Sequence, residues 1–402
     1  MKKDRKGNVF LLAMPGKAIV IAVLAFGLVL AGCATTGGGR EDNPYTGIPI
    51  PAEIQSLAGA LDWISANAVD GGTYTVTLKA DETVQVRSFS YGGKQVSITL
   101  KGDADGRDVS LSGRGSLFSV GGGVTLNVEN LRLKGRGNSE SAANDSPLVR
   151  VQSGGVLKLK AGAVITENYN SGYGGGVWVG ENAALIMEGG EIRGNTAKGN
   201  GGVEVWKGTF TMEGGTIRGN TATGDHGGGV GISENAAFTM KGGAISGNMA
   251  VKTIGGGVNV NKNAVFIMEG GAISDNIANF NGGGVSINGG VFTMEGGTIS
   301  GNISEGSGGV FVMENATFAK KGGTIYGDTD AIHTPGSTEN TASVASATIL
   351  GWGGHAINAR GDKSRNATAG PEITLYAKHE NGVWTYNDSS PGGVGDTTAN
   401  WE

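Results

Sequence analysis

Short segments in which hydrophobic and polar residues alternate make up most of this chain. The first of them are residues 74–78, 84–86, 96–100 and 109–111, and turn-forming residues separate them. Alternation with a period of two places successive side chains on opposite faces of an extended backbone. These segments therefore predict short β-strands bounded by turns.

One segment near the N-terminus has a helical period instead. Leu57, Leu61 and Ile64 recur every three or four residues within 51–69, and residues 70–72 read Asp-Gly-Gly. This spacing predicts one amphipathic helix across 51–69. Because the end of a stack of strands exposes apolar core, we expect the segment 51–72 to cap the N-terminal end of the strands.

From about residue 148 the chain repeats one ten-residue sequence motif. The sequence TMEGGTIRGN at 211–220 returns as TMKGGAISGN at 239–248, IMEGGAISDN at 267–276 and TMEGGTISGN at 293–302. A valine that follows a Gly-Gly pair also returns at intervals of 25 to 28 residues. A fixed period of this length predicts a solenoid. The valines are Val177, Val203, Val230, Val258, Val285 and Val310.

The content of each repeat indicates which solenoid to expect. Each repeat holds two or three short strands and no helical segment, which disfavours a leucine-rich repeat, and a propeller blade needs about 40 residues or more. The predicted fold is therefore all-β: a right-handed parallel β-helix with rungs of 25–28 residues across 73–330. Residues 331–402 lose the repeat, and we expect them to form a C-terminal cap and tail.

Stacked rungs place equivalent side chains on top of one another. In the segment FTME at 292–295, alternation turns Phe292 and Met294 toward the core, and Ile299 follows in the next strand. The matching residues of the other repeats predict continuous apolar columns. An asparagine follows the third strand of each repeat, and we predict a buried ladder of these amides that joins coil to coil. The ladder consists of Asn195, Asn220, Asn248, Asn276 and Asn302.

The first 32 residues are typical of a targeting signal. Residues 18–32 form an apolar run that is short for a membrane span but typical of the core of a signal peptide. The run ends in Leu-Ala-Gly followed by Cys33, which resembles the lipobox of bacterial lipoproteins. This resemblance implies cleavage before Cys33 and lipid attachment at its thiol. Residues 33–50 have no hydrophobic period and predict a flexible tether.

Composition narrows the classes of function. Glycine supplies 77 of the 402 residues without a Gly-X-Y period, so it serves turns and close backbone approaches rather than a collagen helix. Cys33 is the only cysteine, so packing rather than disulfides must stabilise the fold. Cleavage before Cys33 would change the net charge from −5 to −9, because residues 1–32 carry five basic residues and one acidic residue. This charge argues against a nucleic-acid partner and leaves acyl chains as the membrane attachment.

The repeat also resembles a known type of surface protein. The sequences GGAISGN at 242–248 and GGAISDN at 270–276 are similar to the repeats of polymorphic outer-membrane proteins and autotransporter passenger proteins, with Ile-x-x-Asn here in place of Phe-x-x-Asn. With its lipobox, the chain resembles a family of bacterial β-helix lipoproteins. The resemblance implies a lipid-anchored location in the bacterial cell envelope, at the outer membrane.

One acidic segment is a candidate for metal binding. The sequence DADGRD places Asp103, Asp105 and Asp108 as in the start of a calcium loop. Position twelve of such a loop needs a carboxylate, but Arg114 occupies it here, so a turn between strands is the favoured interpretation. The four histidines follow no motif spacing. We therefore predict no catalytic residue, no metal and no cofactor.

The first strand of each repeat supplies a candidate partner surface. One residue in each of these strands points outward between inward valine or isoleucine residues, and Trp178 and Phe311 place aromatic rings toward the two ends of this face. Exposed rings suit contact with a glycan or with a host or envelope protein. The alternative is that loops such as 195–201 and 220–227 fold over the face and make Trp178 a packing residue. The outward residues are Trp178, Glu204, Gly231, Asn259, Ser286 and Phe311.

These observations favour one function and leave another open. We expect a monomeric, non-catalytic envelope β-helix for surface display, adhesion or envelope interaction, held to the membrane by acyl chains. The alternative is a polysaccharide-active, lyase-like or hydrolase-like enzyme, or a glycan-binding β-helix. Three or more carboxylates that converge in one groove would favour the enzyme.

Overall fold

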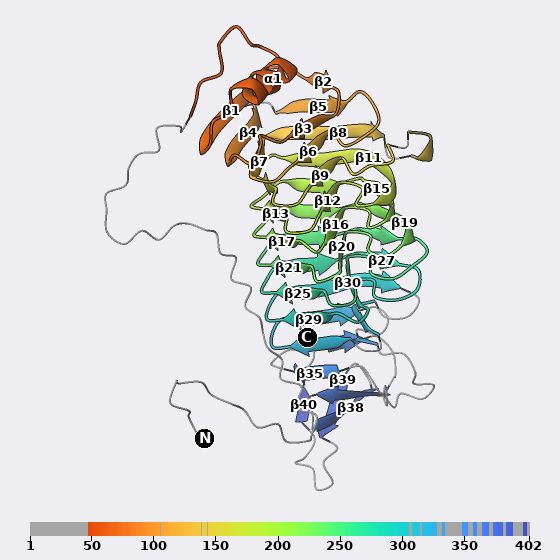
Figure 1. Cartoon of the computed structure of the whole chain (residues 1–402). Coiled ribbons are helices and arrows are strands. Elements are labelled where there is room, and N and C mark those ends of the chain that lie inside the picture. The colour runs from red at the N-terminus through yellow and green to blue at the C-terminus, as the bar shows by residue number, and fades with distance from the viewer. Residues whose placement is uncertain are drawn as a thin grey trace, which may run out of the picture. The chain divides into compact units, whose positions relative to one another are not determined.

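The chain folds into a parallel β-solenoid of about nine turns, with rungs of about 27 residues and one helix near the N-terminus (Figure 1). The computed structural model describes residues 47–327 except 105, 138, 143, 305–307 and 314–315, and also the seven strands β34 to β40. The predicted signal peptide, Cys33 and most of the tether lie outside the described residues. The predicted all-β solenoid with an N-terminal helix is confirmed.

Three sheets run along the solenoid, and nearly all their strands pair in parallel. The first sheet contains β1 (Gly72–Leu78), β4 (Val96–Gly102), β7 (Val124–Glu129), β10 (Val156–Leu159), β13 (Ala184–Met187), β17 (Thr209–Met212), β21 (Ala237–Met240), β25 (Val265–Met268), β29 (Val291–Met294), β32 (Thr317–Lys320) and β35 (Thr348–Trp352), then β37 (Ser364–Ala369), β38 (Ile373–Glu380), β39 (Val383–Asp388) and β40 (Thr397–Ala399). The strands from β37 to β40 pair antiparallel, so the rung pattern ends before them.

The second sheet contains β2 (Glu82–Val84), β5 (Arg107–Leu111), β8 (Leu131–Gly137), β11 (Val164–Tyr173), β14 (Glu191–Arg193), β15 (Thr196–Gly199), β18 (Thr216–Arg218), β19 (Thr221–Asp225), β22 (Ala244–Ser246), β23 (Met249–Ala250), β26 (Ala272–Ser274), β27 (Ile277–Ala278), β30 (Thr298–Ser304), β33 (Thr324–Gly327) and β36 (Ile357–Ala359). The third contains β3 (Arg87–Phe89), β6 (Phe118–Val120), β9 (Val149–Val151), β12 (Val177–Val179), β16 (Val203–Trp206), β20 (Val230–Ser233), β24 (Val258–Val260), β28 (Val285–Ile287), β31 (Val310–Val312) and β34 (Ile332–His333). A short 3₁₀ helix spans Glu140–Ala142.

Each central rung has four strands, one more than the repeat predicted. The additional strand follows the ladder asparagine, as β15 follows β14. It is short and mixes small with polar residues, so its hydrophobic period was too weak to detect. The predicted strand at 84–86 was also wrong in extent: β2 ends at Val84, and Val86 is exposed in the bend before β3.

Like side chains stack in the core, as the repeat predicted. Phe210, Phe238, Phe266, Phe292 and Phe318 form a column of buried, nearly parallel rings whose neighbouring centroids lie 4.4–5.1 Å apart. The strands pair in register, so each ring contacts the same ring in the next rung. The same short sequence therefore packs equally well in every rung, because each rung contacts an equivalent rung on either side.

The five ladder asparagines are fully buried, and each bonds to a neighbouring rung. Asn248 Nδ2 donates to Asn276 Oδ1 at 2.9 Å and to the Ile217 carbonyl of an earlier rung at 2.9 Å. Asn248 Oδ1 accepts from both the backbone N–H and the side-chain amide of Asn220, each at 3.0 Å. The ladder also extends toward the N-terminus through Asn168 and Asn144, which the repeat did not predict.

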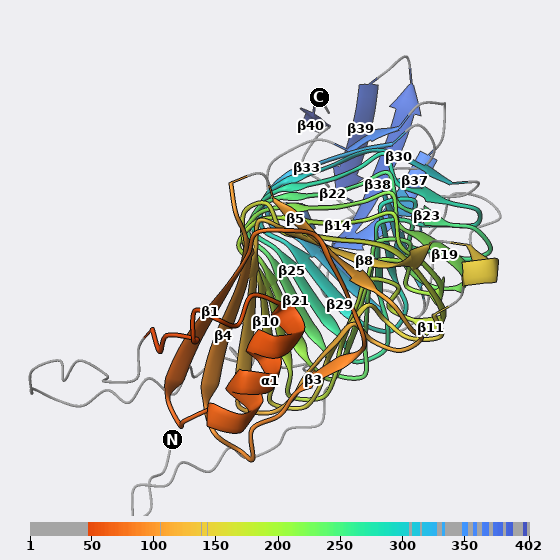
Figure 2. The same ribbon diagram turned by 90° about the horizontal axis from the view of Figure 1, so that it is seen from above.

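The helix is shorter than predicted, because α1 spans only Leu57–Asn67. Its start is set by two contacts: the Ser56 side chain accepts from the Gly59 N–H, and the Glu82 carboxylate accepts from the Leu57 N–H at 2.8 and 2.9 Å. Both contacts satisfy donors that a helix N-terminus leaves unpaired. Figure 2 shows α1 lying across the N-terminal end of the coil, where Ile64 is fully buried. In the part of the chain that the structure describes, no helix is long and apolar enough to cross a membrane.

The position of α1 predicts the result of placing a charge beneath it. Ile64→Asp should uncover the first rung and cause aggregation, because an unpaired carboxylate at a buried site costs several kcal/mol. Ser65→Asp adds the same charge at an exposed position one residue later, and it should leave the protein monomeric. Light scattering after size-exclusion chromatography would compare the two, and a monomeric Ile64→Asp variant with normal melting would show that α1 is no cap.

Candidate functional site

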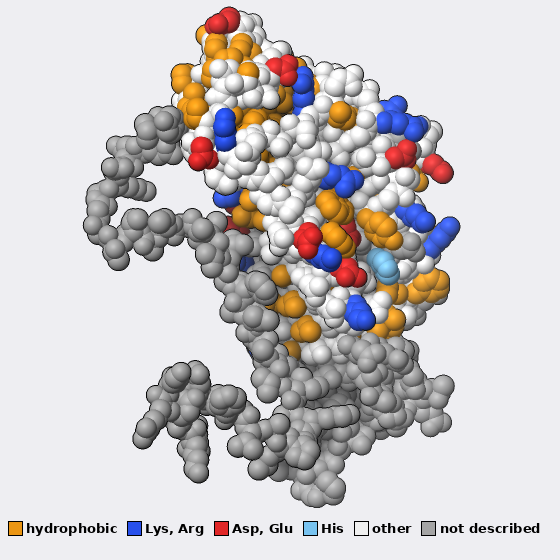
Figure 3. All heavy atoms as spheres, viewed as in Figure 1, with side chains coloured by type: hydrophobic (Ala, Val, Ile, Leu, Met, Phe, Trp, Pro, Cys, Tyr) orange, Lys and Arg blue, Asp and Glu red, His pale blue; other side chains and the backbone are white. Residues whose placement is uncertain are grey.

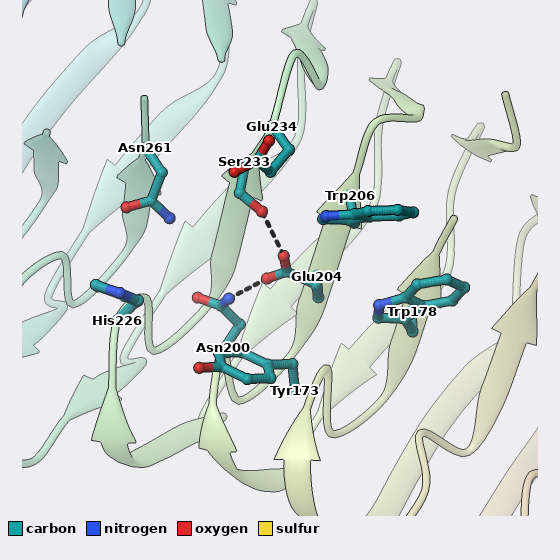
Figure 4. A pocket seen from close by; sticks show the side chains of 9 residues that line it. All are labelled: Tyr173, Trp178, Asn200, Glu204, Trp206, His226, Ser233, Glu234 and Asn261. Atoms are coloured by element: carbon teal, nitrogen blue, oxygen red, sulfur yellow. Dashed lines mark hydrogen bonds between the residues drawn. The ribbon is translucent and has the colours of Figure 1, made fainter. Parts of the chain in front are cut away.

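The candidate site is a hollow of about 510 Å³ on the outer face of the third sheet. Its lining comes from the end of β11, from β12, β16 and β20, and from the loops beside them (Figure 4). In Figure 3, hydrophobic, basic and acidic side chains lie close together over the middle rungs. The lining residues are Tyr173, Trp178, Asn200, Glu204, Trp206, His226, Ser233, Glu234 and Asn261.

The structure places the predicted outward residues in one column but leaves little of that column exposed. Trp178 pairs with Glu204, and Glu204 pairs with Gly231, in consecutive rungs. Phe311 was predicted at an exposed partner face, and this was wrong: only 4% of its surface is exposed. Glu204, Asn259 and Ser286 are also buried.

The turn that carries Asn200 covers part of this column. The alternative interpretation predicted loops at 195–201 and 220–227, but most of these two segments form β15 and β19. The Asn200 side chain lies flat against Gly231, where an added Cβ would come within 2.0 Å of Asn200 Oδ1. Asn200 itself has a φ of 52°, in the left-handed region that asparagine tolerates better than most residues. Glycine at 231 therefore makes room for the loop, and the loop closes one end of the hollow.

A pair of indole rings forms the wall at the other end. Trp178 and Trp206 stack with centroids 6.3 Å apart and planes 20° from parallel, and both side chains are half-buried. The Arg150 guanidinium lies over Trp178 at 4.8 Å, and Lys207 Nζ lies over Trp206 at 4.4 Å. Sequence reasoning missed Trp206, although alternation along β16 turns it to the same side as Glu204.

Glu204 forms the floor of the hollow. Ser233 Oγ donates to one carboxylate oxygen at 2.7 Å, and Asn200 Nδ2 donates to the other. Burial raises the pKa of the Glu204 carboxyl to about 7, and the two hydrogen bonds oppose this rise because they favour the charged form. The column of outward residues included Glu204 in the sequence prediction, but its burial depends on the loop that carries Asn200.

The rest of the lining is polar and more open. Tyr173 is 47% exposed, and Glu234 is exposed beside Ser233. Asn261 Oδ1 accepts from Asn259 Nδ2 at 2.9 Å, and Figure 4 shows its amide turned toward the centre of the hollow. Such a combination of aromatic surface and hydrogen-bonding groups can hold a small or extended polar ligand.

Two aspartates of the acidic segment 103–108 pair with basic side chains. Asp103 accepts from Arg107 at 2.6 Å, while Asp108 pairs with Arg132 and with Lys134. Asp105 lies outside the described residues. Within the described ranges, no group of three or more His, Cys, Asp or Glu side chains could hold a metal ion.

Comparison with known proteins identifies no family for this chain. No protein-family model, no curated protein and no solved structure matches the chain. The site must therefore be interpreted from its own geometry.

Proposed function

We propose that this protein is a lipid-anchored, non-catalytic component of the bacterial cell envelope that attaches to a partner through its solenoid. The targeting signal and lipobox in the sequence support anchoring at Cys33 in the outer membrane. The solenoid supports a display role, because a stack of repeats presents a long and regular surface to a partner. The partner would be a glycan or a host or envelope protein.

One observation carries the attachment proposal: the half-buried pair Trp178 and Trp206 beside the polar floor of the hollow. A large aromatic side chain that is partly exposed gains free energy when a partner buries it. Such residues contribute much of the binding energy at interfaces. The two rings lie in different columns: Glu204, Gly231 and Asn259 follow Trp178, and Ser233 follows Trp206. Neither column places an aromatic residue in these following rungs, so the aromatic pair is a local departure from the repeat.

The anchor can be tested at its single thiol. Cys33→Ser should abolish labelling by a radioactive or clickable fatty acid and move the protein out of the detergent phase, since no other cysteine is present. Thr36→Ser is the matched control, because it changes a neighbouring tether residue without removing a thiol and should leave labelling intact. Labelling that persists in Cys33→Ser would contradict the lipoprotein proposal.

A second candidate function, glycoside hydrolysis, is favoured by a specific observation. Glu204 and Glu234 line the same hollow, and the pKa of Glu204 is raised to about 7, near the value that suits a general acid. Among the described residues only these two carboxylates line it, and the Glu204 oxygens already accept two hydrogen bonds. Release of reducing ends from a polysaccharide by the wild type but not by Glu204→Gln would establish this function in place of the first.

A further inference from the structure

Above about pH 7, where both carboxyls are ionised, the charged groups around the hollow balance one another. Glu204 and Glu234 line it, while Arg150 and Lys207 lie over its two indole rings. A cationic ligand would meet the two basic groups, and an anionic ligand would meet the two carboxylates at close range. Above about pH 7 the hollow therefore has no net charge that would favour a ligand of either sign.

What remains for recognition is aromatic surface and hydrogen bonding. When ionised, above about pH 7, the Glu204 carboxylate has about four acceptor positions, of which Ser233 and Asn200 use two. Below that pH the protonated carboxyl can donate one hydrogen bond and still accept others. Asn261 adds an amide on the same side (Figure 4). A ligand that fits must combine an apolar face for the rings with several hydroxyl groups at its edge.

The aromatic residues are also arranged along the solenoid. Tyr173, Trp178 and Trp206 come from β11, β12 and β16, and β12 and β16 are neighbouring strands of the third sheet. Successive rungs lie about 4.8 Å apart, so an extended ligand could contact more than one ring. This arrangement favours a chain of linked units over a single small molecule.

We propose that the hollow binds a neutral saccharide chain, with a sugar ring against Trp206 and hydroxyl groups on Glu204 and Asn261. This inference rests on the proposed attachment function and names its partner. The C–H face of a pyranose packs on an indole ring, and its hydroxyl edge supplies the donors that the floor can accept. Lys207 lies over Trp206 on a flexible stem, and a cation–π contact of this kind at a half-exposed site is weak, so a sugar ring can displace it.

The test uses the full-length protein in nonionic detergent. Its migration in native gels that contain galactomannan, xyloglucan, laminarin or dextran is compared with its migration in gels that contain polygalacturonate or hyaluronate. We expect at least one neutral polysaccharide to retard the wild type. Trp206→Ala should weaken that binding about thirtyfold, which corresponds to the roughly 2 kcal/mol that a ring at the centre of a binding site contributes.

Two further variants separate binding from folding and from charge. Trp206→Phe keeps an aromatic face, so it should retain most of the binding and should melt like the wild type. Lys207→Ala should bind the neutral polysaccharide as well as the wild type or better, because it uncovers the ring. No retardation by any of the four neutral polysaccharides, or equal retardation of Trp206→Ala, would overturn the proposal. Retardation only by the acidic polysaccharides, lost in Lys207→Ala, would also overturn it.

Failure of this inference can be distinguished from failure of the proposed function. Attachment of whole cells that depends on Trp206, without binding to any neutral polysaccharide, would retain the attachment function and reject the saccharide. Binding to a neutral polysaccharide by a protein that still carries label after Cys33→Ser would retain the saccharide and reject the anchor.

Discussion

Replacing Asn248 with alanine is expected to lower the free energy of unfolding by about 3–5 kcal/mol, the largest single effect that we predict. The substitution leaves two buried backbone groups without their partners: the N–H of Asn220 and the carbonyl of Ile217. Each unpaired buried group costs about 1–3 kcal/mol. The amide link to Asn276 is lost as well, so the ladder is interrupted in the middle of the solenoid.

Urea unfolding followed by circular dichroism would measure this loss. Asn279→Ala is a matched control, because Asn279 lies in a neighbouring rung with an exposed side chain, and its removal should change stability by less than about 0.5 kcal/mol. If the two variants unfold at the same urea concentration, the ladder contributes nothing beyond its neighbours, and the core columns alone stabilise the stack.

The second large effect is a dependence of stability on pH that a single carboxyl causes. The folded protein holds the Glu204 proton up to about pH 7, whereas the unfolded chain releases it near pH 4.5. Between these values the folded state binds more protons, so the free energy of unfolding falls as the pH rises. The full penalty is present above about pH 7 and amounts to about 3 kcal/mol for a shift of this size.

Glu204→Gln removes this penalty and keeps the shape of the side chain. Its amide can donate to Ser233 Oγ, which can accept as well as donate. We expect the variant to gain about 3 kcal/mol over the wild type as the pH rises from 4.5 to 8. Glu234→Gln, at an exposed position of the same hollow, should show no such gain. Parallel stability curves for Glu204→Gln and the wild type would mean that water reaches the carboxyl in solution.

Much of the architecture could be predicted from the chain because the repeat is local and regular. Phe292 and Met294 lie in the core since alternation along a short strand leaves only two choices, and the same choice recurs in every rung. The ladder was predictable for the same reason, except at Asn168 and Asn144, where the flanking residues differ from the repeated sequence. The additional strand in each rung escaped prediction because it carries almost no hydrophobic period.

The site was less predictable, since alternation tells which face a residue is on but not what covers that face. Trp178 and Phe311 occupy equivalent outward positions, yet Trp178 is half-buried at a hollow and Phe311 is 4% exposed. Near Trp178, the path of the covering turn depends on a left-handed residue, Asn200, and on the space above Gly231, and alternation reports neither.

The sequence by itself determined the solenoid, the stacked core and the asparagine ladder. A period of about 27 residues places equivalent side chains on top of one another in adjacent rungs. Only the tertiary structure decided that Glu204 lies buried beneath Asn200 and Ser233, with Trp178 and Trp206 beside it. Trp178, Trp206, Glu204 and Ser233 lie on strands of successive rungs, whereas Asn200 reaches Glu204 from the turn before β16. The repeat does not encode these contacts, because the residues that make them differ from rung to rung.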